Sequence, residues 1–220
     1  MRKTLRDNGL TLVLLLLFLF SLVGQSIVGL AHFNDDQRDH GRGEVTFTQY
    51  ITSAPFAESV FENWESEFLQ MALYVVLTAL LYQRGSAESK DPDKREDVDE
   101  DPYAHVGDPA ANSTVRAGGW LVGVYQHSLS LALLLLFVVS FVLHLIASAK
   151  EDCQDKLLHG QTCTTTLAFI GSSKFWFESF QNWQSEFLSV AVVVVLSIFL
   201  RQRGSPESKP VHAPHSATGR

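Results

Sequence analysis

The chain has 220 residues, 46% of them hydrophobic, and a formal net charge of −7 from 17 basic and 24 acidic residues. Its lysines and arginines form no long tract, which argues against a protein that binds nucleic acid. No charged residue occurs between Asp7 and Asp35 or between Arg116 and Lys150. A soluble domain of this size would mix its charges more evenly, so the sequence indicates a membrane protein.

The first predicted element is a membrane helix in the stretch "LTLVLLLLFLFSLVGQSIVGL", residues 10–30. A bilayer core of about 30 Å needs ~20 mostly apolar residues in a helix, and this stretch meets that length. Its basic start also fits a secretory signal. However, "LTLVLLLLF" at Leu10 has a counterpart, "LSLALLLLF", at Leu129. A removable signal has no reason to be copied within the chain, so we expect it to be retained as the first membrane helix.

The second predicted helix follows the start of the motif "FENWESEFLQ" at Phe61. Its charge-free run, residues 68–83, would be only about 24 Å long at ~1.5 Å per residue. To cross the bilayer it must include part of the preceding segment, which brings Glu67 to the outer edge of the hydrocarbon and Asn63 one turn further out. The run ends at "QRGSAESK", where Arg suits the negative end of the helix dipole and Gly a left-handed C-cap.

An acidic segment, residues 91–119, follows and is predicted to be a solvated cytoplasmic linker. Much of its charge lies in "DPDKREDVDEDP", a composition that cannot build a packed core. The sequence "NST" at Asn112 matches the glycosylation pattern, but a cytoplasmic linker does not meet the glycosylating enzyme.

The third and fourth predicted helices repeat the first two. The third lies in "SLSLALLLLFVVSFVLHLIASA", residues 128–149, and the fourth follows "FQNWQSEFLS" at Phe180 and ends at "QRGSPESK". A shift of 119 residues aligns the two halves without a gap, from the first apolar runs to the "QRGS" motifs. We interpret this match as a tandem, parallel duplication of a two-helix hairpin, which predicts an all-α protein with four transmembrane helices.

The duplication divides the chain into four parts. The first half is residues 1–90, the linker is residues 91–119, the second half is residues 120–209, and residues 210–220 are predicted to be a disordered C-terminal tail. Each half would cross the membrane twice, so both halves share one orientation. Lys and Arg are more frequent at the N-terminus and at the two "QRGS" motifs than in the hairpin loops. This bias predicts that both termini and the linker are cytoplasmic and that the hairpin loops lie outside.

Two cysteines, Cys153 and Cys163, fall in the second outer loop, where oxidising conditions would allow a disulfide. Their equivalents in the first half are Asn34 and Glu44, so the hairpin itself does not require the bond. A disulfide and two free thiols therefore both remain open.

Polar side chains recur at similar depth on all four predicted helices. They form a candidate polar layer in the outer leaflet: Gln25, Asn63, Glu67, His144, Asn182 and Glu186. Ionisable residues at membrane depth are candidates for a proton- or cation-binding site. The competing interpretation is that they only bind the helices to one another. Four aromatic residues beside them are predicted to form an interfacial belt: Trp64, Phe68, Trp183 and Phe187.

The sequence carries no recognisable catalytic or metal motif. Its eight histidines show no HxxxH or HExxH spacing, and we find no phosphate loop and no nucleophile elbow. We therefore expect no metal, no cofactor and no enzymatic activity.

The segments "GLTLVLLLLFLFSLVGQS", "FENWESEFLQM", "QRGSAESK", "SLSLALLLLF" and "FWFESFQNWQSEFL" together resemble a family of small bacterial integral membrane proteins of unassigned function. The resemblance covers nearly the whole chain. It implies a multi-pass protein of the bacterial cytoplasmic (inner) membrane and assigns no activity or site residue.

Two functional hypotheses follow. In the first, the protein binds or conducts a proton or small cation at the polar layer. In the second, it is a structural or accessory protein that contacts the lipid bilayer and docks a membrane-protein partner or a second copy of itself, with the polar layer acting only in helix packing.

Overall fold

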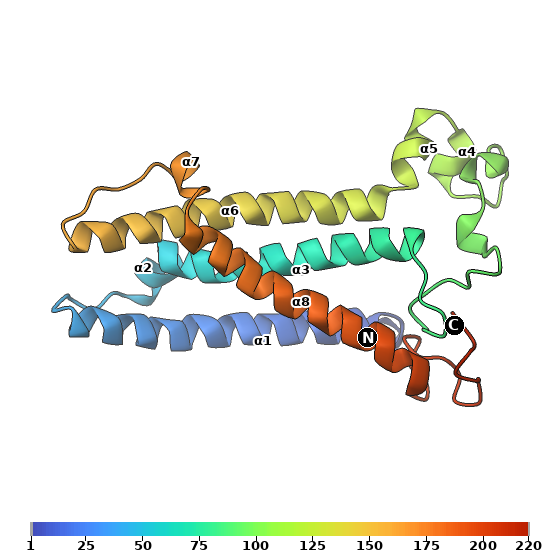
Figure 1. The fold of residues 1–220 in the computed structure, drawn as a ribbon, viewed down its shortest axis with the longest axis horizontal. Coiled ribbons are helices and arrows are strands. Elements are labelled where there is room, and N and C mark those ends of the chain that lie inside the picture. The colour runs from blue at the N-terminus through green and yellow to red at the C-terminus, as the bar shows by residue number, and fades with distance from the viewer. Residues whose placement is uncertain (1, 220) are drawn as a thin grey trace. The chain divides into compact units, whose positions relative to one another are not determined.

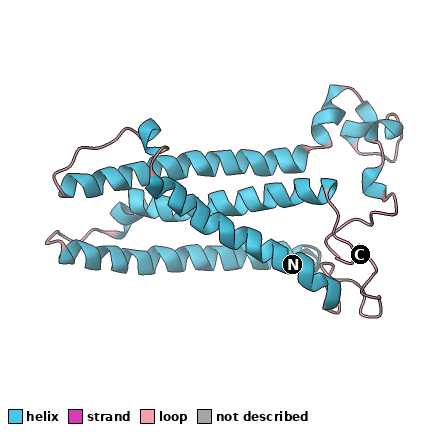
Figure 2. Cartoon of the chain, in the orientation of Figure 1, coloured by secondary structure: helices cyan, strands magenta, loops and turns pink. Residues whose placement is uncertain are grey.

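The computed structural model describes residues 2–219, which are all-helical, with no strand among them (Figures 1 and 2). The four long helices are α1, Arg2–Asp39; α3, Ala54–Leu80; α6, Ser128–Leu158; and α8, Ser173–Phe199. The short helices are α2, Phe47–Ile51; α4, Ser113–Ala117; α5, Trp120–Tyr125; and α7, Thr166–Phe169. Two 3-10 turns, Asp97–Asp99 and Pro102–His105, lie in the linker. The predicted all-α class is confirmed.

Three helices are long and apolar enough to cross a membrane: α1 from Leu5, α6 and α8. The apolar side chains along α1 are largely exposed in the isolated chain; Leu10, for example, is 76% exposed. A surface of this kind is expected to contact lipid. The helix α3, which we predict to be the second span, is not among the three, although it has the same length as α8, 27 residues.

The chain forms two compact units, and each takes segments from both halves of the sequence. The first unit is residues 1–60 with 146–166, and the second is residues 61–145 with 167–220. These units have other boundaries than the halves identified from the repeat, and the division of the chain at residues 90, 119 and 209 stays a prediction.

In the first unit, α1 and α2 pack through Tyr50. The Tyr50 side chain is 6% exposed and lies between the rings of Phe33 and Phe56, with centroid distances of 5.5 and 5.4 Å. Its hydroxyl approaches the backbone of α1 at Gly29, where a Cβ atom would clash with it. The absence of a side chain at Gly29 therefore allows α2 to pack closely on α1.

In the second unit, α8 runs obliquely to α3 (Figure 1), and hydrogen bonds join the two helices at several points. Asn182 donates to Glu62 at 2.6 Å, and the Gln70 amide donates to the backbone carbonyl of Glu186 at 3.1 Å. Beyond the end of α3, the hydroxyl groups of Ser86 and Ser197 lie 2.8 Å apart. The part of α6 before Ile146 joins this pair through aromatic contacts such as that of Phe141 with Phe175, at 5.3 Å.

Element boundaries recur at the spacing of the sequence repeat. The helices α1 and α6 end at Asp39 and Leu158, and α3 and α8 end at Leu80 and Phe199, so each pair of ends is 119 residues apart. The starts of α2 and α7 and those of α3 and α8 have the same spacing. The equivalent halves thus adopt the same local structure.

The "QRGS" motifs do not cap the helices as we expected. The helices end at Leu80 and Phe199, before the motifs, so the positive-φ Gly85 and Gly204 lie in later turns. Each motif instead closes its own turn through a serine, since Ser89 accepts from the backbone N–H of Gln83 at 2.8 Å and the second motif repeats this bond.

The two motif lysines bind different partners. Lys90 forms an ion pair of 2.5 Å with Asp99, and this bond lowers the pKa of the Asp99 carboxyl. Lys209 is 1% exposed and donates to the carbonyl groups of Gly85, His215 and Ala217. Burial lowers the pKa of its ammonium group. Lys209 thus ties the C-terminal tail to the turn that follows α3.

The close contact between Gly29 and Tyr50 leads to a first prediction. We expect Gly29→Ala to lower the thermal unfolding midpoint in detergent, because the new methyl group must displace the Tyr50 ring. Gly24 is the matched control on the same helix, since a Cβ there meets nothing within 4 Å. Gly24→Ala should stabilise the helix by up to ~1 kcal/mol. Equal behaviour of the two variants in circular dichroism melts would contradict the packing of α2 on α1.

Candidate functional site

The most deeply buried ionisable side chain of the second unit is His144, in the middle of α6. The imidazole is 0% exposed, and it lies between carboxylates from two other helices. Its Nδ1 atom is 2.6 Å from Oε2 of Glu65 on α3, and its Nε2 atom is 3.6 Å from Oε2 of Glu178 on α8. The Phe175 ring covers one face of the imidazole, with a centroid distance of 5.0 Å. The contact brings α3, α6 and α8 together at one point.

Further polar groups surround this pair. Glu65 is 1% exposed, and its second oxygen accepts from the indole N–H of Trp183 at 3.0 Å. Glu62, one turn before Glu65, accepts from the Asn182 amide at 2.6 Å. We name these two neighbouring groups together, the contacts of His144 and the Glu62–Asn182 pair, the His144 cluster: Glu62, Glu65, His144, Glu178, Asn182 and Trp183.

The helical repeat explains why these residues meet. Residues three or four apart share a helix face, so Glu62 and Glu65 project together from α3. For the same reason Glu178 and Asn182 project together from α8. The sharp turn before α8 is fixed by Ser172, whose hydroxyl caps the helix by accepting from the backbone N–H of Phe175 at 3.2 Å.

The charges of the cluster do not balance. Three carboxylates face one imidazole, and Lys174 approaches Glu178 from the more exposed edge at 3.8 Å. With every group ionised, the cluster and Lys174 together carry three negative and two positive charges, a net −1. An uncompensated charge away from water is unfavourable. One additional proton would make the group neutral, and that proton would belong to the coupled set rather than to any single residue.

The structure brings together two of the six residues that we predict for the polar layer, His144 and Asn182. Glu67 and Asn63 are exposed, and Glu186 is half-buried within electrostatic reach of Glu67. Gln25 lies in the other compact unit, where it donates to Ser59 at 3.1 Å. Each residue advances a helix by about 100°, so Glu67 points about 200° away from Glu65 and cannot join the cluster.

A sequence signal for the missed carboxylates does exist. Glu62 and Glu65 have neutral equivalents, Gln181 and Gln184, and His144 likewise has a neutral equivalent, Gln25. Each of these ionisable residues of the His144 cluster therefore breaks the repeat. The predicted polar layer took its carboxylates from a pair that repeats, Glu67 and Glu186, and therefore left out Glu62 and Glu65.

The predicted aromatic belt is distributed over different environments. Trp183 belongs to the His144 cluster and packs edge-on against Trp176 at 6.2 Å. Trp64 packs against Phe61 at 5.6 Å, Phe68 is half-buried, and Phe187 is 39% exposed. Their position at a membrane interface stays a prediction.

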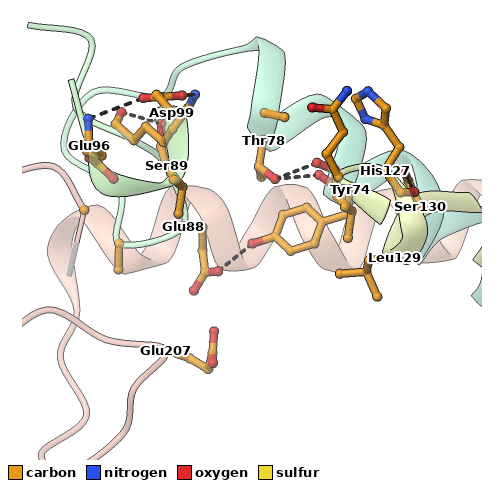
Figure 3. A pocket seen from close by; sticks show the side chains of 17 residues that line it. Tyr74, Thr78, Glu88, Ser89, Glu96, Asp99, His127, Leu129, Ser130 and Glu207 are labelled. Carbon is orange, nitrogen blue, oxygen red and sulfur yellow. Dashed lines mark hydrogen bonds and ion pairs between the residues drawn. The ribbon is translucent and has the colours of Figure 1, made fainter. Parts of the chain in front are cut away.

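A cavity of about 800 Å³ lies near the other end of α3 (Figure 3). Tyr74 and Thr78 line it from α3, and Tyr74 donates to Glu88 at 2.5 Å. Glu207, which is equivalent to Glu88, lines the same cavity from the second motif. Polar residues at intervals of four continue along α3 from the His144 cluster toward this cavity: Glu62, Ser66, Gln70, Tyr74 and Thr78.

Among residues 2–219, no group of three or more His, Cys, Asp or Glu side chains has a geometry suited to a metal ion. The His144 cluster itself consists of imidazole, carboxylate, amide and indole groups.

Comparison with known proteins supports the sequence interpretation. Residues 1–220 match the family described as Domain of unknown function (DUF6766). The chain belongs to this family. The resemblance to a family of unassigned function is thereby confirmed. No curated protein and no solved structure matches the chain.

The cluster geometry predicts a sharp difference between two neighbouring glutamates. Glu65→Ala removes the partner of a buried imidazole, a change that typically costs 3–5 kcal/mol, and we expect a loss of about 3 kcal/mol or more. Glu67→Ala, two residues later on the exposed side, should change stability by no more than ~0.5 kcal/mol. Unfolding of both variants in the same lipid nanodiscs measures the difference. The reverse order would place Glu67, and not Glu65, inside the bundle.

Proposed function

We propose that this membrane protein takes up and releases one proton at the His144 cluster, within the depth of the bilayer. The observation that carries the proposal is the fully buried imidazole between Glu65 and Glu178. Imidazole and carboxyl groups exchange protons under physiological conditions, and their low-dielectric surroundings couple them strongly. Binding one proton removes the excess charge of the cluster.

The equivalent pair in the first half supports this assignment. Gln25 and Ser59 are equivalent to His144 and Glu178, and they form a hydrogen bond of 3.1 Å with no ionisable group. A neutral pair is therefore sufficient to link the equivalent helices. The ionisable pair in the second half is more than helix packing requires, which favours a role in proton binding.

We further propose that α3 is a fourth membrane span and that the two halves arose by duplication. Gln70 and Ser189, which bond at 3.2 Å, are equivalent positions on α3 and α8. Contacts between equivalent positions are expected where two repeats pack around a twofold axis. Buried polar residues such as Glu65, Ser66 and Gln70 reduce the hydropathy of α3 without placing charge in lipid.

The proposed location is a bacterial cytoplasmic membrane, with both termini and the linker inside. The cavity at Tyr74 and Glu88 would then face the cytoplasm, and the polar face of α3 would join it to the His144 cluster. A proton bound at the cluster could reach the inner side along this face. We therefore propose that the proton moves from the outer leaflet toward the cytoplasmic side.

Proteoliposomes that contain a pH-sensitive dye test the function. We expect the wild-type protein to move protons in response to a pH gradient, and we expect His144→Gln with Glu178→Ser to reduce the flux at least about tenfold. This double variant reproduces the neutral pair of the first half; with Glu65→Gln added, which matches the equivalent residue Gln184 and removes the carboxylate left without its imidazole, it should keep the fold. Glu67→Gln is the matched control and should retain the wild-type flux.

Infrared difference spectra across the neutral pH range provide a second readout. The band of a protonated carboxyl group should change with pH in the wild type and should be lost in Glu65→Gln. If neither flux nor this band depends on the cluster, its bonds serve only to pack the helices and the proposal fails.

A further inference from the structure

The two hairpin loops are held closed at the same repeat position by different chemistry. In the first half, the buried Asn34 side chain forms two hydrogen bonds with the backbone of Val45: its amide donates to the carbonyl at 3.1 Å, and its oxygen accepts from the N–H at 2.8 Å. An ion pair of 2.8 Å between Arg38 and Glu44 lies beside them. Together these bonds join the end of α1 to the segment before α2.

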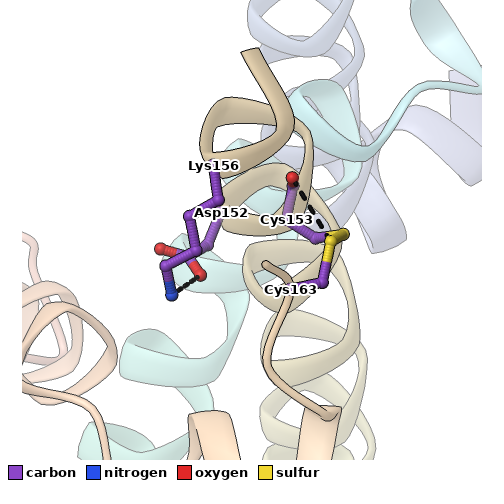
Figure 4. Close-up of a disulfide and its surroundings, with 4 residues drawn as sticks. All are labelled: Asp152, Cys153, Lys156 and Cys163. Carbon is purple, nitrogen blue, oxygen red and sulfur yellow. Dashed lines mark hydrogen bonds and ion pairs between the residues drawn. A yellow bond between two sulfur atoms is a disulfide. The ribbon is translucent and has the colours of Figure 1, made fainter. Parts of the chain in front are cut away.

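In the second half, a disulfide takes this place (Figure 4). It joins Cys153, the equivalent of Asn34, to Cys163, the equivalent of Glu44, with Cα atoms 4.8 Å apart. The ion pair of the first loop has no equivalent, since Leu157 occupies the position of Arg38. The turn at the helix end is the same in both loops. The backbone N–H of Gln161 donates to the carbonyl of Lys156 at 2.8 Å, and the backbone N–H of Arg42 donates to the carbonyl of Gln37 at 2.7 Å. A single covalent bond thus replaces a set of non-covalent ones.

We infer that the Cys153–Cys163 disulfide is a redox-responsive clasp, a bond that holds its hairpin loop closed, and that it exchanges with dithiols in the compartment outside the membrane. The hydrogen bonds of Asn34 with Val45 are the clasp of the first loop. Cys163 is exposed and Cys153 is half-buried, so an attacking thiolate reaches the Cys163 sulfur first. Attack forms a mixed disulfide at Cys163 and releases the Cys153 thiolate, which takes up a proton. The second thiol of the dithiol then displaces Cys163. The dithiol becomes a disulfide, and both protein cysteines become thiols.

The consequence of reduction is confined to one loop. The first hairpin contains no cysteine and keeps its Asn34 clasp in either redox state. The second hairpin loses the bond that ties residues 161–165 to the end of α6. Local opening of this segment exposes the backbone around Lys156, which otherwise pairs with Asp152 at 2.6 Å (Figure 4).

Limited proteolysis of proteoliposomes with added trypsin tests this inference. We expect dithiothreitol to accelerate cleavage after Lys156 at least about tenfold and re-oxidation to restore protection. After reduction, a membrane-impermeant maleimide should label two thiols per chain. Unchanged cleavage, or thiols that cannot be labelled from outside, would overturn the inference.

The first half supplies a matched control. Cys153→Asn with Cys163→Glu transfers the Asn34 side chain and its loop partner into the second loop without adding a trypsin site, and should give protection that dithiothreitol does not alter. Cys153→Ser with Cys163→Ser should be cleaved as fast as the reduced wild type under both conditions. If the transferred clasp is cleaved like the serine variant, the two clasps are not equivalent and the inference is wrong.

Discussion

The pairing of His144 with Glu65 inside the protein is the interaction on which the second unit depends. Neither group is accessible to water, so each requires the other, and each is fixed by its own helix. Glu178 and Trp183 add bonds from a third helix to the same pair. In a membrane, where lipid provides little driving force between helices, such polar contacts determine which faces meet. The same contacts place an excess charge where it is unfavourable, and the proposed proton binding rests on this charge.

The two halves of the chain share their helix boundaries and turns but differ in the ionisable residues that lie inside the bundle. Helix boundaries, turn glycines and motif serines recur at one interval, while the groups able to ionise inside the bundle do not. Acidic residues come from the first half at Glu62 and Glu65, and the imidazole comes from the second at His144. At each of these positions the other half carries a neutral residue, so the proposed duplication would allow the two halves to gain ionisable groups at different positions.

The sequence was sufficient to predict the all-α fold class and the equivalence of α1 with α6 and of α3 with α8. Long apolar runs and the 119-residue repeat can both be read without any tertiary information. It also identified His144, Asn182 and Trp183 as residues of interest. It was not sufficient to choose between Glu65 and Glu67, because that choice depends on helix rotation: two residues correspond to about 200°. Polar residues form more than one stripe on α3, one with Ser66 and Gln70 and another with Asn63 and Glu67, so the pattern alone does not show which side is covered by protein. The cap function predicted for the "QRGS" motifs was wrong because the helices stop earlier, where the serine-closed turns begin.

The bonds of Lys209 have a topological consequence. Its ammonium group connects the end of the second half to the turn that follows α3 in the first, so the chain returns to its own midpoint. The covalent path between the halves through residues 91–119 is therefore duplicated by a non-covalent one. If the polypeptide were interrupted in that segment, the bonds of Lys209 would still join residues 209–217 of the second fragment to the turn at Gly85 of the first.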